Sequence, residues 1–168
     1  MTDDERAFSF IPLNPREGKP RTRGLTEIRG PYYSVMGSRY LSDLLETVGD
    51  WVDSLKFAGG SFTLMPKSAV RSIIDTAHAH QVQVSTGGFI EHVLSLGPAI
   101  VDRYIDECGQ MGFDIVEISS GFLSMPADDM VRLTKKVLEK GLKPKPEVGI
   151  QFGAGGTSTV TELATEGT

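Results

Sequence analysis

The chain contains a single cysteine, no long apolar run and fewer basic than acidic residues. Cys108 has no partner for an internal disulfide, which agrees with a reducing compartment. No apolar run approaches the roughly 18 residues of a membrane-spanning helix. The first residues, MTDDERAFSF, are too acidic and polar for a secretory signal. We therefore expect a cytoplasmic protein that does not enter a membrane.

Acidic residues outnumber basic ones by 22 to 17, so the net charge is −5, which argues against a nucleic-acid-binding surface. The segment PREGKPRTRG, with Arg16, Lys19, Arg21 and Arg23, is a local exception. Such a run is most often a solvated arm, and the alternative is a segment that binds an anion or a neighbouring subunit. We assign residues 1–23 to an N-terminal arm and residues 24–168 to one domain.

Beyond the arm, short β-rich runs alternate with segments of helical periodicity, and strand starts recur about every 30 residues, the length of one strand–helix unit. The predicted strands are LTEIR from Leu25, WVDSLKF from Trp51, VQVS from Val82, FDIVEIS from Phe113 and PEVGIQF from Pro146. The helical stripe after the second strand consists of Val70, Ile73, Ile74 and Ala77. Cys108 lies in a similar stripe, so we interpret it as a core residue. The pattern predicts an α/β fold with a parallel sheet.

Five units suit two architectures. A closed (β/α)8 TIM barrel at this spacing would need about 240 residues, so the chain has the appearance of a barrel truncated to about five β/α units. An open doubly wound sheet fits the rhythm equally well. A five-stranded fragment has two unpaired edges, which predicts a homo-oligomer in which another copy covers them.

A lysine interrupts the apolar pattern of the second strand. Strand side chains alternate between faces, so Leu55 and Phe57 would face the helices and Lys56 the opposite side. The same alternation places Glu117 and Glu147 inside a barrel, near the carboxyl ends of their strands, where barrel enzymes build active sites. We predict these three charges as catalytic residues. A structural layer of ion pairs is the alternative.

The first strand and the glycine turns complete the predicted site. Glu27 and Arg29 share one face of the first strand, also assigned to its carboxyl end. Glycine-rich turns follow the second, third and fourth strands, and their N–H groups would let an anion approach closely. The predicted substrate-binding residues are Arg29, Gly59, Gly60, Gly87, Gly88 and Ser119.

The segments RGLTEIRG, VDSLKFAGGS, STGGFIEHVLSLGP, DECGQMGFDIVEISSG and KPEVGIQF together resemble the phosphosulfolactate synthase family, whose members are (β/α)8 barrels. The resemblance runs from Arg23 to Phe152. It implies a lyase that adds sulfite to phosphoenolpyruvate to give phosphosulfolactate, the opening step of coenzyme M biosynthesis. Because the family includes plant heat-stress-associated proteins, a noncatalytic or stress-related role, or inactivity through truncation, is the alternative.

The family reaction suggests roles for the charged residues. The resemblance implies Mg²⁺ as cofactor, and Glu117 and Glu147 would supply the oxygen ligands that this ion prefers. Lys56 would act electrostatically or donate a proton to the substrate. A third reading, a Schiff-base aldolase that uses Lys56, is chemically permissible.

Overall fold

The computed structural model describes residues 6–30, 36–121 and 123–147, and every structural statement below concerns this part of the chain. Within it, five strands form one parallel sheet in the order β1-β2-β3-β4-β5. The strands are β1 (Glu27–Arg29), β2 (Ser54–Lys56), β3 (Gln83–Ser85), β4 (Ile115–Ile118) and β5 (Lys143–Pro146). The predicted α/β fold with a parallel sheet is confirmed.

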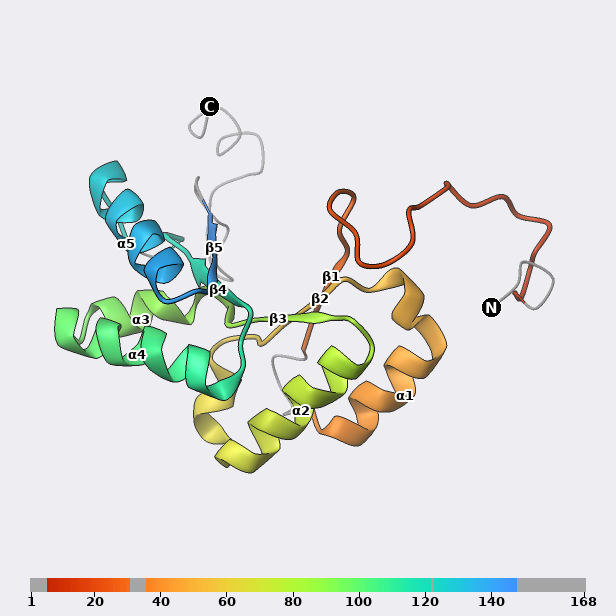
Figure 1. The fold of residues 1–168 in the computed structure, drawn as a ribbon, viewed down its shortest axis with the longest axis horizontal. Coiled ribbons are helices and arrows are strands. Elements are labelled where there is room, and N and C mark those ends of the chain that lie inside the picture. The colour runs from red at the N-terminus through yellow and green to blue at the C-terminus, as the bar shows by residue number, and fades with distance from the viewer. Residues whose placement is uncertain (1–5, 31–35, 122, 148–168) are drawn as a thin grey trace, which may run out of the picture.

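Helices connect consecutive strands and lie on one side of the sheet (Figure 1). They are α1 (Ser38–Val48), α2 (Lys67–Ala79), α3 (Ile90–Leu94), α4 (Pro98–Met111) and α5 (Ala127–Glu139), with short 3-10 turns η2 (Gly49–Trp51), η3 (Ser61–Leu64) and η4 (Gly87–Phe89). A doubly wound sheet reverses its strand order and carries helices on both faces. The sequential order is instead that of successive barrel units. β1 and β5 do not pair with each other, so the described residues do not close a barrel.

The hydrophobic core lies between the sheet and the helices. Leu55, Val84 and Val116 are fully buried on the helix-facing side of neighbouring strands. The buried residues of α2 are the four that the sequence predicted, Val70, Ile73, Ile74 and Ala77. Cys108 is also a core residue, and burial raises the pKa of its thiol to about 12. At that pKa the thiol stays protonated near neutral pH, as a packing role requires.

β5 spans Lys143–Pro146, so the fifth strand starts three residues before the predicted Pro146. Residues 148–152 of the predicted strand lie outside the described part of the chain. The backbone N–H groups of Lys143 and Glu147 donate to Asp114 and Ile118 next to and within β4. Pro144 and Pro146 alternate with these donors and therefore face the edge of β5 that points away from β4. Their lack of an N–H group costs no hydrogen bond to β4.

The basic arm is bound to its own domain, so the prediction of a solvated arm is wrong for Arg16, Lys19 and Arg21, while binding of an anion or a neighbouring subunit stays a prediction. Arg16 donates to the carbonyl of Trp51 at 3.0 Å, and Lys19 donates to the carbonyls of Gly49 at 3.0 Å and His80 at 2.6 Å. Arg16 and Arg21 also pair with the buried carboxylate of Asp53, just before β2. These contacts hold the arm against the amino ends of the strands.

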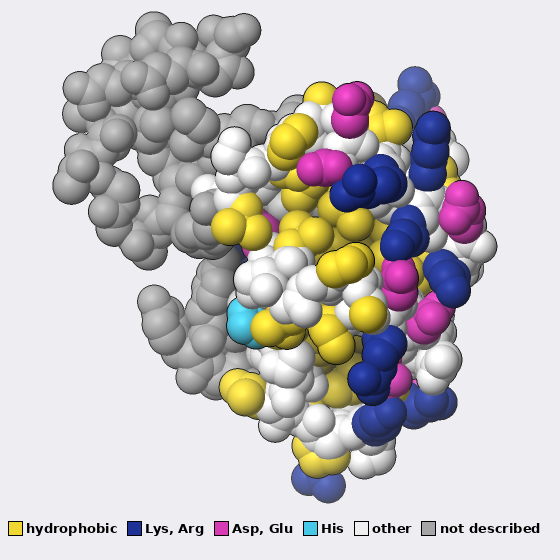
Figure 2. All heavy atoms as spheres, turned by 90° about the vertical axis from the view of Figure 1, so that its left-hand side faces the viewer, with side chains coloured by type: hydrophobic (Ala, Val, Ile, Leu, Met, Phe, Trp, Pro, Cys, Tyr) yellow, Lys and Arg dark blue, Asp and Glu magenta, His cyan; other side chains and the backbone are white. Residues whose placement is uncertain are grey.

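One outer face of the molecule carries hydrophobic side chains beside charged groups. Figure 2 shows hydrophobic side chains in the middle of the face that carries α3 and α5, beside a row of basic and acidic groups. Ion pairs link neighbouring helices, with Lys140 Nζ 2.6 Å from Asp106 Oδ1 and Lys67 Nζ 2.5 Å from Glu107 Oε1. Among the helices of the described residues, none has the length and hydropathy of a membrane span.

Candidate functional site

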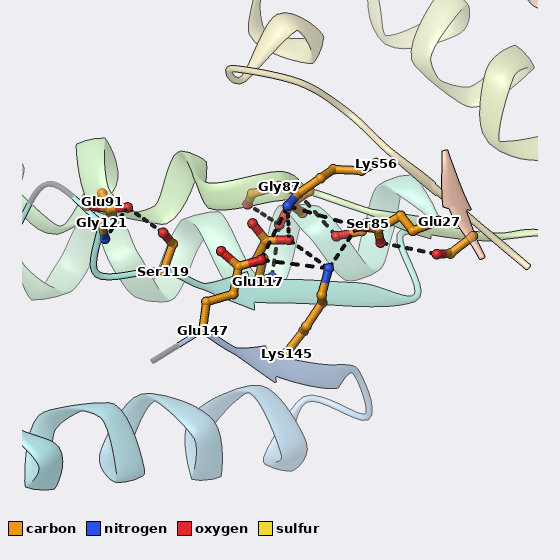
Figure 3. Close-up of polar contacts among 12 residues, drawn as sticks. Glu27, Lys56, Ser85, Gly87, Glu91, Glu117, Ser119, Gly121, Lys145 and Glu147 are labelled. Carbon is orange, nitrogen blue, oxygen red and sulfur yellow. Dashed lines mark hydrogen bonds and ion pairs between the residues drawn. The ribbon is translucent and has the colours of Figure 1, made fainter. Parts of the chain in front are cut away.

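Charged side chains from four strands and the residue after β5 meet on the sheet face opposite the helices (Figure 3). Lys56 Nζ lies 2.7 Å from Glu117 Oε2 and 3.3 Å from Glu147 Oε1. Lys56 ends β2, Glu117 lies in β4 and Glu147 follows β5 directly. The structure therefore brings the three predicted catalytic residues together, while their catalytic roles stay predictions.

A second lysine, Lys145, completes this charged cluster and was missed by the sequence analysis. Lys145 Nζ lies 2.8 Å from Glu27 Oε1, 3.2 Å from Glu117 Oε2 and 3.8 Å from Glu147 Oε1. Lys145 and Glu147 are two residues apart, so they share a face of an extended chain. That alternation would have identified Lys145 if the strand had been started at Lys143. We refer below to Glu27, Lys56, Glu117, Lys145 and Glu147 as the charged cluster.

Glu27 was predicted near the carboxyl end of its strand but is the first residue of β1. It joins the cluster because the sheet curls. Lys145 on β5 contacts Glu27 on β1, although these strands are the two edges of the described sheet. A flat five-stranded sheet would hold its edge strands almost 20 Å apart, at about 4.8 Å per strand spacing. The described sheet is therefore curved, and the side chains on its inner face converge.

The cluster places three carboxylates around two ammonium groups, a net charge of −1 if all five are ionised. Burial raises the pKa of Glu117 above its ordinary value, although the hydrogen bond and charge of Lys56 oppose the shift. Burial alone would lower the pKa of Lys145, but the carboxylates of Glu27 and Glu117 outweigh it and raise that pKa. The cluster thus combines a carboxylate that accepts a proton readily with an ammonium that keeps its own.

The glycine turn after β3 packs directly against the cluster. A Cβ on Gly87 would lie 2.4 Å from the carbonyl oxygen of Phe57 and 3.5 Å from Lys56 Cγ, and Gly87 has a φ of +62°. A Cβ on Gly88 would lie 3.6 Å from Glu117 Oε1. At position 87 only glycine allows the turn to approach so closely. Gly87 and Gly88 therefore line the site, and binding of an anion by their amides remains a prediction.

The other predicted binding residues are placed differently. Gly60 packs against the ring of Phe89, where a Cβ would come within 2.0 Å of a ring carbon, and Gly59 is exposed next to it. Arg29 is exposed at the carboxyl end of β1, in register with Lys56. Arg29 thus flanks the cluster, whereas Gly60 has a packing role that explains its lack of a side chain.

Ser119 lies in the site, but its hydroxyl proton is already used. Ser119 Oγ donates to Glu91 Oε1 at 2.5 Å, and a Cβ on Gly88 would lie 3.1 Å from it. A serine hydroxyl has one proton, so Ser119 presents acceptor lone pairs rather than a donor to any ligand. Glu91 was missed by the sequence analysis. Its position in the first turn after the STGGF turn was the available signal.

The carboxylates are of the ligand type that binds a magnesium ion, but they are not arranged as a metal site. Among the described residues there is no group of three or more His, Cys, Asp or Glu side chains arranged to hold a metal. Mg²⁺ is commonly bound by one or two carboxylates together with substrate oxygens and water, which Glu117 and Glu147 would satisfy. Lys56 and Lys145 compete for the same oxygens. The donor set therefore suits a metal that binds together with an anionic substrate better than a free ion.

The curled parallel sheet in sequential order, with a charged cluster on its inner face, defines the chain as an α/β protein built of consecutive strand–helix units. Residues 14–167 match the sequence model of the family described as (2R)-phospho-3-sulfolactate synthase (ComA). The chain belongs to this family.

Two curated relatives extend the comparison. The chain is 42% identical over 144 residues to the protein HEAT-STRESS-ASSOCIATED 32 of Arabidopsis thaliana, covering 86% of this chain and 50% of the relative. It is 31% identical over 143 residues to a phosphosulfolactate synthase of Methanothermobacter thermautotrophicus, covering 85% of this chain and 54% of the relative. The chain thus spans about half the length of these relatives.

Proposed function

We propose that this chain carries the carboxylate–lysine part of a phosphosulfolactate synthase-like active site, which adds sulfite to phosphoenolpyruvate. The observation that supports the proposal best is the charged cluster itself, with Lys56 between Glu117 and Glu147 on the inner face of a barrel-type sheet. Family membership and the 31% identity to a phosphosulfolactate synthase support the same substrates.

The reaction needs stabilised negative charge and a proton. Sulfite sulfur bonds to the methylene carbon of phosphoenolpyruvate, the carbon–carbon double bond opens, and its electron pair moves toward the substrate carboxylate. A proton must then reach the neighbouring carbon. The ammonium groups of Lys56 and Lys145 would stabilise the developing charge. Lys56, 2.7 Å from Glu117 Oε2, would donate this proton.

Magnesium would add a further positive charge to the same site. When bound through Glu117 and Glu147, Mg²⁺ would supply charge stabilisation for the substrate carboxylate. The neighbouring ammonium groups would then bind the phosphate or sulfite oxygens, with Arg29 at the end of β1 as a third cation. A Schiff base on Lys56 fits less well, because imine formation would break two ion pairs.

Incubation of the protein with phosphoenolpyruvate, sulfite and Mg²⁺, followed by mass analysis of the products, tests this function. We expect phosphosulfolactate, and we expect its formation to require the metal. Glu117→Gln keeps the shape of the side chain but removes its charge, and it should abolish metal-dependent turnover. Unchanged turnover in this variant would remove Glu117 from the reaction.

A noncatalytic or stress-related role is the second candidate, and the 42% identity to the plant heat-stress-associated protein favours it. The two candidates differ in what they predict for the wild-type protein. A stress-related protein without turnover should give no sulfonated product even when it is folded and saturated with phosphoenolpyruvate, sulfite and Mg²⁺. Product formation at a rate that depends on Lys56 would decide for the enzyme.

We further propose that the chain assembles with copies of itself. In the described sheet β1 and β5 each pair with one strand only. The free edge of β1 presents backbone N–H and C=O groups to another strand, whereas Pro144 and Pro146 leave carbonyl groups alone on the free edge of β5. Size-exclusion chromatography with light scattering should give a mass above the 18.2 kDa of one chain. A stable monomer at micromolar concentration would contradict this proposal.

A further inference from the structure

A buried carboxylate outside the charged cluster, that of Glu91, holds the loop after β4. Glu91 lies in the first turn of α3 and is 7% exposed. Its Oε1 accepts from Ser119 Oγ at 2.5 Å and from the amide of Gly121 at 3.1 Å, and its Oε2 accepts from the amide of Leu123 at 3.1 Å. Both carboxylate oxygens therefore bind donors from one loop.

These hydrogen bonds join two successive strand–helix units. Glu91 belongs to the unit of β3, whereas its donors belong to the connection from β4 to α5. A carboxylate buried without partners would be costly, so Glu91 and the loop depend on each other. Loops usually move more than the elements they connect. Here the side chain of Glu91, rather than a regular helix or strand, fixes the loop to the strand–helix unit of β3.

The fixed loop stands directly beside the charged cluster. Ser119 follows Glu117 by two residues, and Figure 3 shows Glu91, Ser119 and Gly121 gathered next to Glu117. The η4 turn touches both groups, because a Cβ on Gly88 would lie 3.1 Å from Ser119 Oγ and 3.6 Å from Glu117 Oε1. A shift of Ser119 would therefore change the space next to the Glu117 carboxylate.

We propose that Glu91 is a positioning residue for the anionic substrate. By consuming the only proton of Ser119 and holding the amides of Gly121 and Leu123, it sets the shape and polarity of the wall beside Glu117. Glu91 acts through this loop rather than on the reacting atoms. Its loss should therefore weaken substrate binding more than it slows bond formation. The inference rests on the proposed function, since phosphoenolpyruvate is taken as the ligand.

The test compares the wild-type chain with Glu91→Ala and with Glu139→Ala, a control that removes an exposed carboxylate near the end of α5. Two quantities are measured on folded protein: amide hydrogen exchange of Gly121 and Leu123, and the Kd for phosphoenolpyruvate with Mg²⁺. In Glu91→Ala we expect exchange at both amides to accelerate and the Kd to rise about 10- to 100-fold, by analogy with the loss in affinity when an outer-shell partner is removed from a metal site. The control should change neither.

The outcomes distinguish a role of Glu91 in positioning the substrate from a role in supporting the fold alone. Faster exchange with a Kd within about twofold of wild type would show that Glu91 only supports the fold and would overturn the proposal. Unchanged exchange would overturn it by showing that Glu91 does not hold the loop. If Glu91→Ala does not fold, Glu91→Gln, which keeps one carbonyl oxygen for the hydroxyl or an amide, should show the same changes at smaller size. If wild-type protein does not bind phosphoenolpyruvate, the proposed function and this role fail together, whereas the other two failures leave the function intact.

Discussion

Asp53, just before β2, tests whether residues at the amino ends of the strands stabilise the fold without contributing to ligand binding at the carboxyl ends. Its carboxylate is 7% exposed and accepts hydrogen bonds from the Thr26 amide at 2.8 Å, Arg21 Nη1 at 2.9 Å and Arg16 Nη2 at 3.1 Å. In barrels the amino ends of the strands serve stability, whereas the carboxyl ends carry chemistry. We therefore predict that Asp53→Asn destabilises the fold without weakening ligand binding at the charged cluster.

The size of the effect follows from the contacts. Asp53→Asn keeps one oxygen for the Thr26 amide but removes the negative charge that holds two arginines and the arm. Its NH2 group also cannot accept the hydrogen bond that Arg21 donates to Oδ1. Breaking a buried ion pair from one side costs about 3–5 kcal/mol. Arg16 is 21% exposed, so water compensates it partly, and we expect the low end of that range. A loss of about 3 kcal/mol corresponds to a fall in Tm of about 6–12 °C for a chain of this length.

Urea denaturation of wild-type protein and Asp53→Asn measures this loss. Asp129→Asn is the control, because its partner Arg132 is 72% exposed and such surface pairs contribute under about 1 kcal/mol. The reasoning is refuted if Asp53→Asn loses no more stability than the control. It also fails if the variant binds phosphoenolpyruvate markedly more weakly than wild type, because Asp53 would then influence the far end of the sheet.

The same carboxylate predicts how stability responds to acid. Burial alone would raise the pKa of Asp53, but the Thr26 amide and the two arginines outweigh it and lower that pKa. A carboxyl with a lowered folded pKa contributes stability that is present above its unfolded pKa and is lost as the pH falls through the folded value. The stability difference between wild type and Asp53→Asn should therefore be constant near neutral pH and shrink below about pH 3.8.

Two further predictions concern the site. Gly87→Ala should lose more stability in urea than Gly141→Ala, because both glycines have positive φ but only a Cβ at position 87 meets backbone, 2.4 Å from Phe57 O; equal losses would show that the turn relaxes. Lys145 has a raised pKa, so its stabilising effect should persist below about pH 10.5 and be lost as the pH rises through the higher folded pKa. The stability difference between wild type and Lys145→Gln, followed from pH 8 to pH 12, should shrink at the alkaline end, and a constant difference would contradict the assignment.

Sequence patterning was sufficient for the parts of the fold that burial dictates. The stripe from Val70 to Ala77 repeats at helical spacing, and its four residues are the buried ones of α2. Alternation in β2 and β4 correctly placed Lys56 and Glu117 on the face opposite the helices, because Leu55 and Val116 must be buried. Where a strand or helix has one apolar side that must be buried, its polar residues can be assigned to the opposite side.

The missed features depend on geometry that periodicity does not record. β5 starts three residues before the predicted Pro146, in a run of alternating lysines and prolines that has no apolar periodicity. The Lys145–Glu27 contact spans 118 residues and arises from curvature of the whole sheet. The arm was predicted to be solvated because it is a short basic run. Its contacts could not be read from residue types, since Arg16 and Lys19 bind backbone carbonyls, which every sequence contains. Glu91 binds a hydroxyl and amides rather than a charge, so no complementary residue type pointed to it.

Whether the charged cluster serves function or folding can be tested with a charge-neutral double replacement. Lys56→Met with Glu117→Leu removes one ammonium and one carboxylate, so the net charge of the cluster is unchanged and Lys145 keeps Glu27 at 2.8 Å. Buried ion pairs replaced together by apolar residues of similar volume are often neutral or stabilising by about 1–4 kcal/mol, whereas removing one partner is strongly destabilising. We therefore expect the double variant to unfold at a urea concentration equal to or above that of wild type.

Glu117→Leu alone should be less stable than the double variant, because it leaves the Lys56 ammonium with only its longer contacts to Glu147 and Glu27. A stable double variant that no longer binds phosphoenolpyruvate would mean that these charges are kept at the expense of stability, as an active site requires. A loss of more than about 3 kcal/mol in the double variant, as large as for breaking a buried pair from one side, would instead mean that the ion pairs hold the sheet together. The noncatalytic alternative would then explain the cluster better than catalysis does.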